Sequence, residues 1–334
     1  MNEKHESALR APTAPARRNL LAAAVLAPAL AGAGTVAGAG AAHAAAPRAG
    51  GGEPVRPVIT DPSDWADVGA ALGRPGSMLR GLIYRTPFLR HDLRVVSEGI
   101  AISPALAVGS YVAFVRYADG STMAMGDLTV TENELQAVTA ALQEHHIGQT
   151  AIHKHLLSQR PALWWTHIHG HGADPVALAT GIRAAIDRTG TPPPPEPPPA
   201  RGIDLDTAGM EEALGSPGTI DGGVFKIVFL RRETVVEAGL ELPRGLGATT
   251  AFNFQPLGGG RAALNGDFAM TAGEVQDVLT LLSRNRIGVV TLHNHMLREE
   301  PRLFFVHLWA VGDGVELARA LRPAVDVTNV VPPG

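Results

Sequence analysis

Alternating hydrophobic and polar residues, the pattern of strands that bury one face, recur in the same order in two parts of the chain. Segments 110–118 (SYVAFVRYA) and 249–257 (TTAFNFQPL) carry this alternation. Each precedes a second strand-like segment, which we expect to end at Gly126-Asp127 and at Gly266-Asp267. The pattern therefore predicts the same pair of strands twice.

Helical spacing follows each strand pair. A threonine and a glutamate three residues apart, Thr131 with Glu134 and Thr271 with Glu274, predict a capping box at the start of a helix. The hydrophobic residues at helical spacing after them are Leu135, Val138 and Leu142 in one part and Val275, Val278 and Leu282 in the other. Two further strand-like segments and a second amphipathic helix, around 175–188 and 315–322, complete each part.

Direct sequence similarity shows that the two parts are copies. MGDLTVTENELQAV (125–138) matches NGDFAMTAGEVQDV (265–278), and HIGQTAIHKHLL (146–157) matches RIGVVTLHNHML (286–297). The predicted fold class is α+β, with two tandem copies of a domain that has a mostly antiparallel sheet and two packed helices. We expect the first repeat at 58–190 and the second at 202–330, joined by a proline-rich linker at 191–201, which favours an extended conformation.

Histidines are concentrated at matching places in the two copies. Eight of the 13 histidines lie in the segments 151–172 and 291–309. A constant offset of 140 residues places His153 on His293, His155 on His295 and His167 on His307. The first copy adds His169 and His171, whereas the second has Trp309 where the first has His169.

The strand period predicts which of these histidines point the same way. Side chains two residues apart share one face of a strand, so His153 faces with His155, and His167 with His169 and His171. A hairpin turn near Gln159-Arg160 would place His153 opposite His167, within reach of one ion. The second copy would pair His293 with His307 in the same way.

Imidazoles without thiolates suit zinc or copper, or ferrous iron if a carboxylate joins them. The candidate metal ligands are His153, His155, His167, His169, His171, His293, His295 and His307. Because the first copy has five of these histidines and the second three, we expect the working site in the first copy. Packed core histidines are the alternative, although grouped neutral rings would leave donors and acceptors unpaired. Asp127 and Asp267 fit ordinary turn chemistry or a role in orienting ligands.

The N-terminal residues predict export. Arg17-Arg18 precede a weakly apolar Ala/Gly-rich segment and small residues such as Ala42-His43-Ala44, the pattern of a cleavable twin-arginine signal peptide over 1–46. An N-terminal anchor is the alternative, but Pro28 and several glycines make a poor spanning helix. We therefore expect a secreted or extracytoplasmic protein without a stable membrane span.

Composition narrows the chemistry. The sequence has no cysteine, which excludes disulfides, thiolate metal ligands, a cysteine nucleophile and a lipid-modified cysteine. A net charge of -4 and scattered basic residues give no surface pattern for nucleic acid. Any partner is therefore expected to be a small molecule or a cell-envelope ligand.

The motifs MGDLTVTENEL, IHKHLL with WTHIHGHG, NGDFAMTAGEV and TLHNHMLREEPRLFFVHLWAVGD together resemble the LppY/LpqO family of bacterial secreted proteins and lipoproteins. The resemblance covers nearly all of the chain after the signal segment. It implies two tandem copies of a domain of unknown function, and it transfers no reaction or catalytic residue. Lipid anchoring does not carry over, because there is no cysteine.

Three functions are compatible with these observations. The first is an exported metal-binding protein with a histidine-rich site in the first repeat, which could act as a metal-dependent hydrolase of a small extracytoplasmic substrate. The second is a non-catalytic protein for metal handling or cell-envelope ligand binding. The third is a structural secreted protein whose histidines only pack.

Overall fold

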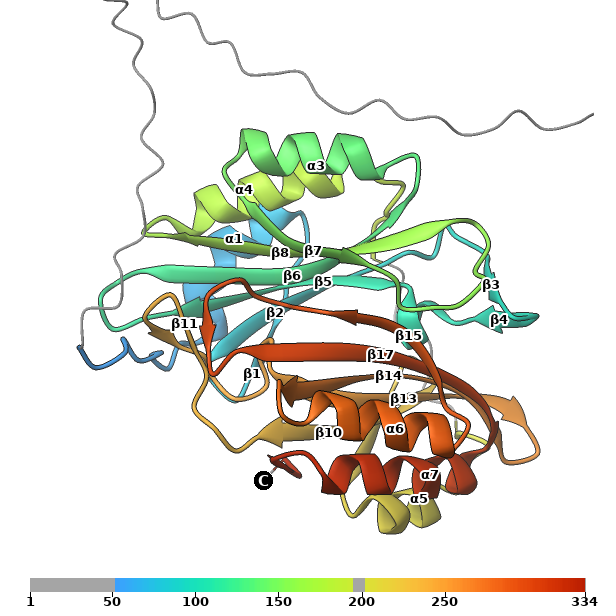
Figure 1. The fold of residues 1–334 in the computed structure, drawn as a ribbon. Helices are drawn as coiled ribbons and strands as arrows, with labels where there is room; N and C mark the ends of the chain where they lie inside the picture. Colours follow the sequence, from blue (N-terminus) through green and yellow to red (C-terminus); the bar gives the residue numbers. More distant parts are fainter. Residues whose placement is uncertain (1–51, 195–201, 334) are drawn as a thin grey trace, which may run out of the picture. The chain divides into compact units, whose positions relative to one another are not determined.

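The computed structural model describes residues 52–194 and 202–333. The expected signal peptide, with Arg17-Arg18, and most of the expected linker lie outside these residues. Within them the chain forms two similar α+β units that follow one another in sequence (Figure 1). The predicted fold class is confirmed.

The first unit contains a six-stranded antiparallel sheet with the strand order β1-β2-β5-β6-β8-β7. Its strands are β1 (Ser77–Leu79), β2 (Ile83–Leu89), β5 (Gly109–Arg116), β6 (Thr122–Thr131), β7 (Gly148–His153) and β8 (Leu163–Gly172). A short hairpin of β3 (Val95–Ser97) and β4 (Ile100–Ile102) lies outside this sheet.

The second unit repeats this order in a seven-stranded sheet, β15-β17-β14-β13-β10-β18, with β9 also paired to β10. Its strands are β9 (Gly218–Asp221), β10 (Val224–Arg231), β13 (Thr249–Gly258), β14 (Arg261–Thr271), β15 (Gly288–His293), β17 (Leu303–Asp313) and β18 (Val330–Val331). A small separate sheet joins β11 (Val236–Glu237), β12 (Leu240–Glu241) and β16 (Glu299–Glu300).

Helices cover one face of each sheet. In the first unit these are the 3-10 helix η1 (Pro62–Trp65), α1 (Ala66–Leu72), α3 (Leu135–Glu144) and α4 (Pro175–Ile186), with the short α2 (Pro104–Ala107) before β5. In the second unit they are α5 (Thr207–Leu214), α6 (Val275–Arg284) and α7 (Gly314–Asp326). One hydrophobic core fills the space between helices and sheet in each unit.

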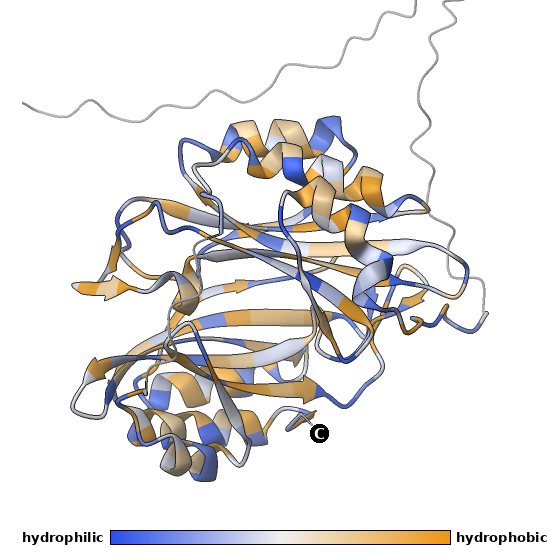
Figure 2. Ribbon diagram, turned by 180° about the vertical axis from the view of Figure 1, so that it is seen from behind, coloured by the Kyte–Doolittle hydropathy of each residue, from blue (hydrophilic) through white to orange (hydrophobic). Residues whose placement is uncertain are grey.

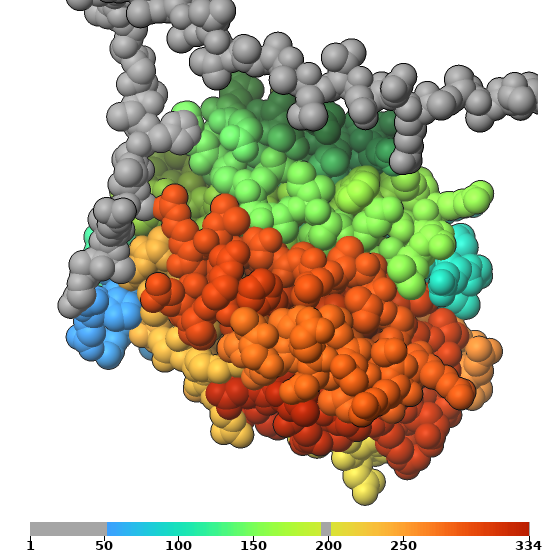
Figure 3. All heavy atoms as spheres, viewed as in Figure 1, coloured from blue at the N-terminus to red at the C-terminus, as the bar shows by residue number. Residues whose placement is uncertain are grey.

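The opposite faces of the two sheets pack against each other, so the layers run helices, sheet, sheet, helices (Figure 1). Strand β5 illustrates this double burial: Val112 and Phe114 face the helices, whereas Ala113 and Val115 join a core with Met296 and Phe305 of the second unit. Hydrophobic strands accordingly lie between the two helix layers in Figure 2. Atoms of the two units also meet along a common boundary in Figure 3.

Strand β6 continues past the point at which the sequence pattern predicted its end. It runs through Asp127 to Thr131, and β14 likewise runs through Asp267 to Thr271. Almost every residue of β6 is buried because both of its faces are covered, so no polar alternation marks its end. Asp127 and Asp267 are therefore mid-strand residues rather than turn residues.

The predicted capping glutamates do more than cap a helix. Glu134 accepts a hydrogen bond from the backbone N–H of Thr131 at 2.8 Å, one of the two bonds of a capping box, whereas the Glu134 N–H donates to the carbonyl of Thr131 rather than to its hydroxyl. It also pairs with Arg90, whose side chain is 1% exposed, at 2.8 Å. Arg231 and Glu274 make the same pair in the second unit at 2.6 Å. A buried arginine paired in this way ties the helix start to the sheet in each unit.

Among the described residues, no helix is long and apolar enough to cross a membrane.

Candidate metal centre

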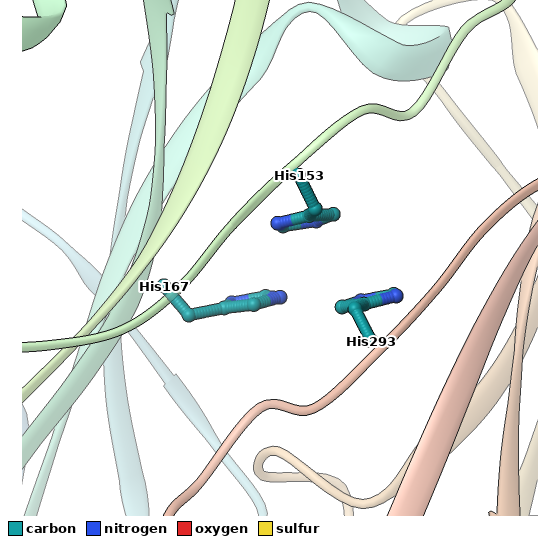
Figure 4. Close-up of side chains that lie close together, drawn as sticks. All are labelled: His153, His167 and His293. Atoms are coloured by element: carbon teal, nitrogen blue, oxygen red, sulfur yellow. The ribbon is translucent and has the colours of Figure 1, made fainter. Parts of the chain in front are cut away.

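Six histidines from both repeats meet where the inner faces of the two sheets come together. They lie on or just after β7 and β15, or on β8 and β17, and β7 contacts β15 directly. We call them the histidine cluster: His153, His155, His167, His293, His295 and His307. Figure 4 shows three of them, with the rings of His153 and His167 from the first repeat beside that of His293 from the second.

Ring contacts within the cluster cross from one repeat to the other. The ring centroids of His153 and His293 are 4.1 Å apart and nearly parallel. His155 lies 3.9 Å from His307, and His167 lies 4.1 Å from His295, in matching tilted arrangements. The two repeats therefore meet with approximate twofold symmetry at this point.

Hydrogen bonds from side chains to main-chain carbonyl groups hold the strands of the cluster together. The Thr150 hydroxyl donates to the His295 carbonyl at 2.5 Å, and the Thr291 hydroxyl donates to the Lys154 carbonyl at 2.7 Å. The Asn265 amide donates to the His155 carbonyl at 2.7 Å. These bonds run between repeats and fix the backbone at the histidines.

Four imidazoles are oriented by main-chain carbonyl groups. Nδ1 of His295 lies 3.0 Å from the Gly247 carbonyl, and Nδ1 of His307 lies 3.1 Å from that of Gly266. In the first repeat, His155 bonds to the carbonyl of Ala107 and His167 to that of Gly126.

The acceptors stand at the same offset of 140 residues as the histidines. A ring that donates its Nδ1 proton to a carbonyl presents a lone pair on Nε2, as metal-ligating histidines do.

Ring nitrogens in the cluster are buried without hydrogen-bond partners. These atoms are Nδ1 of His153, both ring nitrogens of His293, and Nε2 of His167, His295 and His307. Unpartnered polar atoms are rare in protein interiors because their desolvation is not compensated. A group of them at one point could hold an ion that accepts lone pairs.

Two carboxylates face the cluster from the central strands. Asp127 lies directly across the ladder from His167, and Asp267 lies across from His307. Oδ2 of Asp127 is 3.1 Å from Nε2 of His155, and Oδ2 of Asp267 is 3.1 Å from Nε2 of His295. Oδ1 of each carboxylate is buried without a partner. Each carboxylate could therefore act as a ligand beside the imidazoles.

Burial shifts the pKa values of the groups of the site toward their neutral forms. Desolvation lowers the pKa of His167 to about 3 and that of His295 to about 4, with neighbouring histidines adding to the shift at His167. Desolvation also raises the pKa of Asp267 to about 7 and raises that of Asp127. Neutral imidazoles are the form that binds metal.

Several sets of these donors are close enough to hold an ion. The ligand atoms lie within 4.8 Å of one another in three groups, which are His153 with His167 and His293, His153 with His155 and His307, and Asp267 with His293 and His295. Two of the three groups combine residues of both repeats. Buried histidine and aspartate groups at this place could therefore hold a metal ion.

The residue before each aspartate, Gly126 or Gly266, lies too close to a neighbouring strand for a side chain. A Cβ at Gly126 would lie 2.5 Å from the Tyr111 carbonyl oxygen, and one at Gly266 would lie 2.9 Å from that of Ala251. Backbone atoms cannot yield as a flexible side chain can, so only glycine fits. The same residues supply the carbonyl groups that orient His167 and His307.

His169 and His171 lie away from the cluster. His169 points to Glu237 of the second repeat, with Nδ1 3.6 Å from Oε1, and its Nε2 has no partner. Burial lowers the pKa of His169 to about 4 and raises that of Glu237 to about 7. His171 is exposed. Neither His169 nor His171 belongs to one of the groups of possible metal ligands described above. The sequence did not point to Glu237, because this residue, unlike the histidines, is not part of a motif that recurs in both repeats.

The geometry corrects two expectations. The hairpin register places His153 opposite Trp165 and His167 opposite Ala151, two residues away from the predicted pairing of His153 with His167. Both histidines still share a face, and their ring centroids are 4.6 Å apart. In addition, the histidines of the first copy do not form a separate group, since the inner faces of both sheets pack together and bring both sets into one cluster.

A family model matches both repeats, at residues 66–188 and 208–327, and it is described as Domain of Unknown Function (DUF1259). The chain belongs to this family. The domain occurs twice in tandem, in agreement with the internal repeat.

No curated protein matches the chain. Among solved structures, the chain is similar to a trimeric bacterial microcompartment shell protein, PduB, at 10% identity and a TM-score of 0.21. The similarity covers 75% of this chain and 92% of the shell protein.

Proposed function

We propose that this protein binds transition-metal ions in a centre built jointly by its two repeats, and that it does so outside the cytoplasm. The observation that carries the proposal is the set of buried ring nitrogens without partners, aimed at one another from both repeats. Histidines that only pack would leave these atoms uncompensated. A metal ion accepts their lone pairs and removes that cost.

Zinc and copper are the ions that we propose first. Neutral imidazoles with one or two carboxylates and no thiolate suit either ion, and they also suit ferrous iron. The resemblance to secreted LppY/LpqO proteins supports the extracytoplasmic location, and the metal is supported by the histidine cluster alone.

The metal content of the purified mature chain tests this function. Protein dialysed against zinc or copper and then against buffer should retain metal in elemental analysis. The variant His153→Ala/His293→Ala should retain much less, because it removes the stacked pair at the centre. The matched control His91→Ala/His171→Ala, at exposed positions, should retain as much as wild type. Equal retention by all three proteins, or none in wild type, would reject the proposal.

Export through the twin-arginine route is part of the proposal and rests on Arg17-Arg18. Replacing both arginines with lysine should leave precursor in the cytoplasm. Normal secretion of that variant would remove the twin-arginine route from the proposal.

Metal-assisted hydrolysis is a second candidate function, and the two carboxylates beside the imidazoles favour it. Asp127 or Asp267 could take a proton from a metal-bound water if one ligand position stays open. Zinc-loaded protein should then hydrolyse simple aryl esters or phosphate esters, and both Asp127→Asn and Asp267→Asn should lower turnover. Equal rates for zinc-loaded and metal-free protein on these substrates would leave binding as the function.

A further inference from the structure

The number of donors in the centre exceeds what one ion can use. Six histidines and two aspartates offer eight side chains, whereas zinc in proteins takes four ligands and larger shells of first-row ions rarely exceed six. A single ion would leave part of the buried set without partners. The uncompensated desolvation of these remaining donors therefore indicates that the centre holds more than one ion.

The donors divide into two equivalent sets. The first half-site consists of Asp127, His153, His155 and His307. The second half-site consists of Asp267, His293, His295 and His167. Each member of one set has its counterpart in the other at the offset of 140 residues.

Distances within the two half-sites agree. The Asp–His Oδ2 to Nε2 separation is 3.1 Å in both. The ring centroids of His153 and His155 are 4.9 Å apart, and those of His293 and His295 are 5.2 Å apart. The ring centroid of the histidine from the other repeat lies 3.9 Å from that of its neighbour in the first half-site (His307 to His155) and 4.1 Å in the second (His167 to His295). In each half-site three of the four donors have ligand atoms within 4.8 Å of one another, His153 with His155 and His307 in the first, and Asp267 with His293 and His295 in the second. With the fourth donor each half-site offers three imidazoles and one carboxylate, the number of ligands that a zinc ion takes.

His153 and His293 lie between the two half-sites. Their stacked rings are 4.1 Å apart, and each also belongs to the donor group of its own half-site, His153 with His155 and His307, and His293 with Asp267 and His295. Two ions on either side of this stack would be close neighbours, as in two-metal centres, where the ions are about 3.5–4 Å apart. His153 of the first half-site and His167 and His293 of the second also have ligand atoms within 4.8 Å of one another, so the two half-sites are adjacent.

We propose that the centre holds two ions, one in each half-site, and that each half-site is completed by a histidine of the opposite repeat. This inference rests on the proposed function and specifies how the same centre is organised. It follows that metal binding links the two repeats, because neither repeat contains all four donors of a half-site.

Two double variants of the full mature chain test this arrangement, and each removes two cluster histidines. His155→Ala/His307→Ala empties the first half-site and leaves the second intact. His155→Ala/His167→Ala removes residues of the first repeat only, but takes one ligand from each half-site. Native mass spectrometry after zinc loading and dialysis should show two ions per chain in wild type, one in the first variant and none in the second.

Cobalt(II) titration of the unmodified protein supplies a measurement that does not depend on how the variants fold. The visible absorption of bound cobalt should saturate at two equivalents per chain. One equivalent, or the same zinc content in both folded double variants, would overturn the two-ion arrangement while leaving metal binding in place. No metal in wild type would instead reject the proposed function itself. Circular dichroism of each metal-free variant establishes that it is folded.

Discussion

An imidazole can ligate a metal only through a nitrogen that carries no proton, and this structure fixes which nitrogen that is. The carbonyl groups of Gly247 and Gly266 hold Nδ1 of His295 and His307, so Nε2 of each ring is left for an ion. Oδ2 of Asp267 lies 3.1 Å from Nε2 of His295, and Oδ1 of Asp267 lies 3.9 Å from Nδ1 of His307. The carbonyl groups that orient these two rings and the Asp267 carboxyl group therefore contact the same rings.

Asp127→Asn tests the carboxylate at this scale. The substitution keeps the shape of the side chain and replaces a carboxyl group, whose Oδ2 lies 3.1 Å from Nε2 of His155, with an amide, which is a weaker ligand for a metal ion. We expect zinc affinity at the first half-site to fall by at least about 10–100-fold, the usual effect of changing a residue behind a metal ligand, because Asp127 is itself one of the four donors. Calorimetric titration measures the change, and Asp119→Asn, at an exposed position, is the control. Unchanged affinity in Asp127→Asn would show that this carboxylate takes no part.

At the scale of strands, period-two alternation and the internal repeat predicted much of the centre. His153 and His155, and their counterparts, share a face because residues two apart must do so. The bulge in β7 and the passage of β6 through Asp127 were not predictable, because neither changes the local hydrophobic pattern. Asp127 was therefore placed at a strand end, as a turn residue or one that orients a ligand, although it lies mid-strand opposite His167.

Gly266→Ala tests how tightly the central strand is held. The added Cβ would lie 2.9 Å from the Ala251 carbonyl oxygen and 2.8 Å from the Phe252 ring, so β14 must shift. We expect the free energy of unfolding to fall by about 1–3 kcal/mol, the usual cost of overpacking. Gly273→Ala, where a Cβ meets nothing within 4 Å, should change it by less than about 0.5 kcal/mol. Denaturant titration of both variants makes the comparison, and equal stabilities would contradict this account.

At the scale of the whole molecule, the two repeats are joined by a core that both share and by the histidine cluster inside it. The sequence predicted two copies but not that their inner faces meet, since hydrophobic patterning marks a face as buried without naming what covers it. That is why a separate site in the first copy was expected, and why His169 and His171 were grouped with residues that they do not reach. The shared centre arises only from the packing of the repeats.

Acid should destabilise the metal-free protein. The folded state holds the pKa of His295 near 4 and that of His167 near 3, whereas an unfolded histidine titrates near about 6.5. The unfolded state therefore binds more protons below pH 6.5, and the free energy of unfolding falls as the pH drops from about 6.5 towards 4.

Asp267 acts in the opposite direction, because its raised pKa of about 7 favours folding as the pH falls from 7 to 4. The six cluster histidines outnumber the two carboxylates, so net destabilisation is expected. Denaturant midpoints of chelator-treated protein at pH 7 and pH 5 measure the effect. A higher midpoint at pH 5 would show that the histidines do not dominate.

Anomalous X-ray diffraction from crystals of the zinc-loaded protein tests the central claim most directly. The account predicts anomalous density at the zinc edge between β7 and β15, surrounded by Nε2 atoms from His155 and His307 and from His167 and His295. Zinc bound only at His169 or His171, or well-ordered zinc-loaded crystals without density in the cluster, would contradict a metal centre shared by the two repeats.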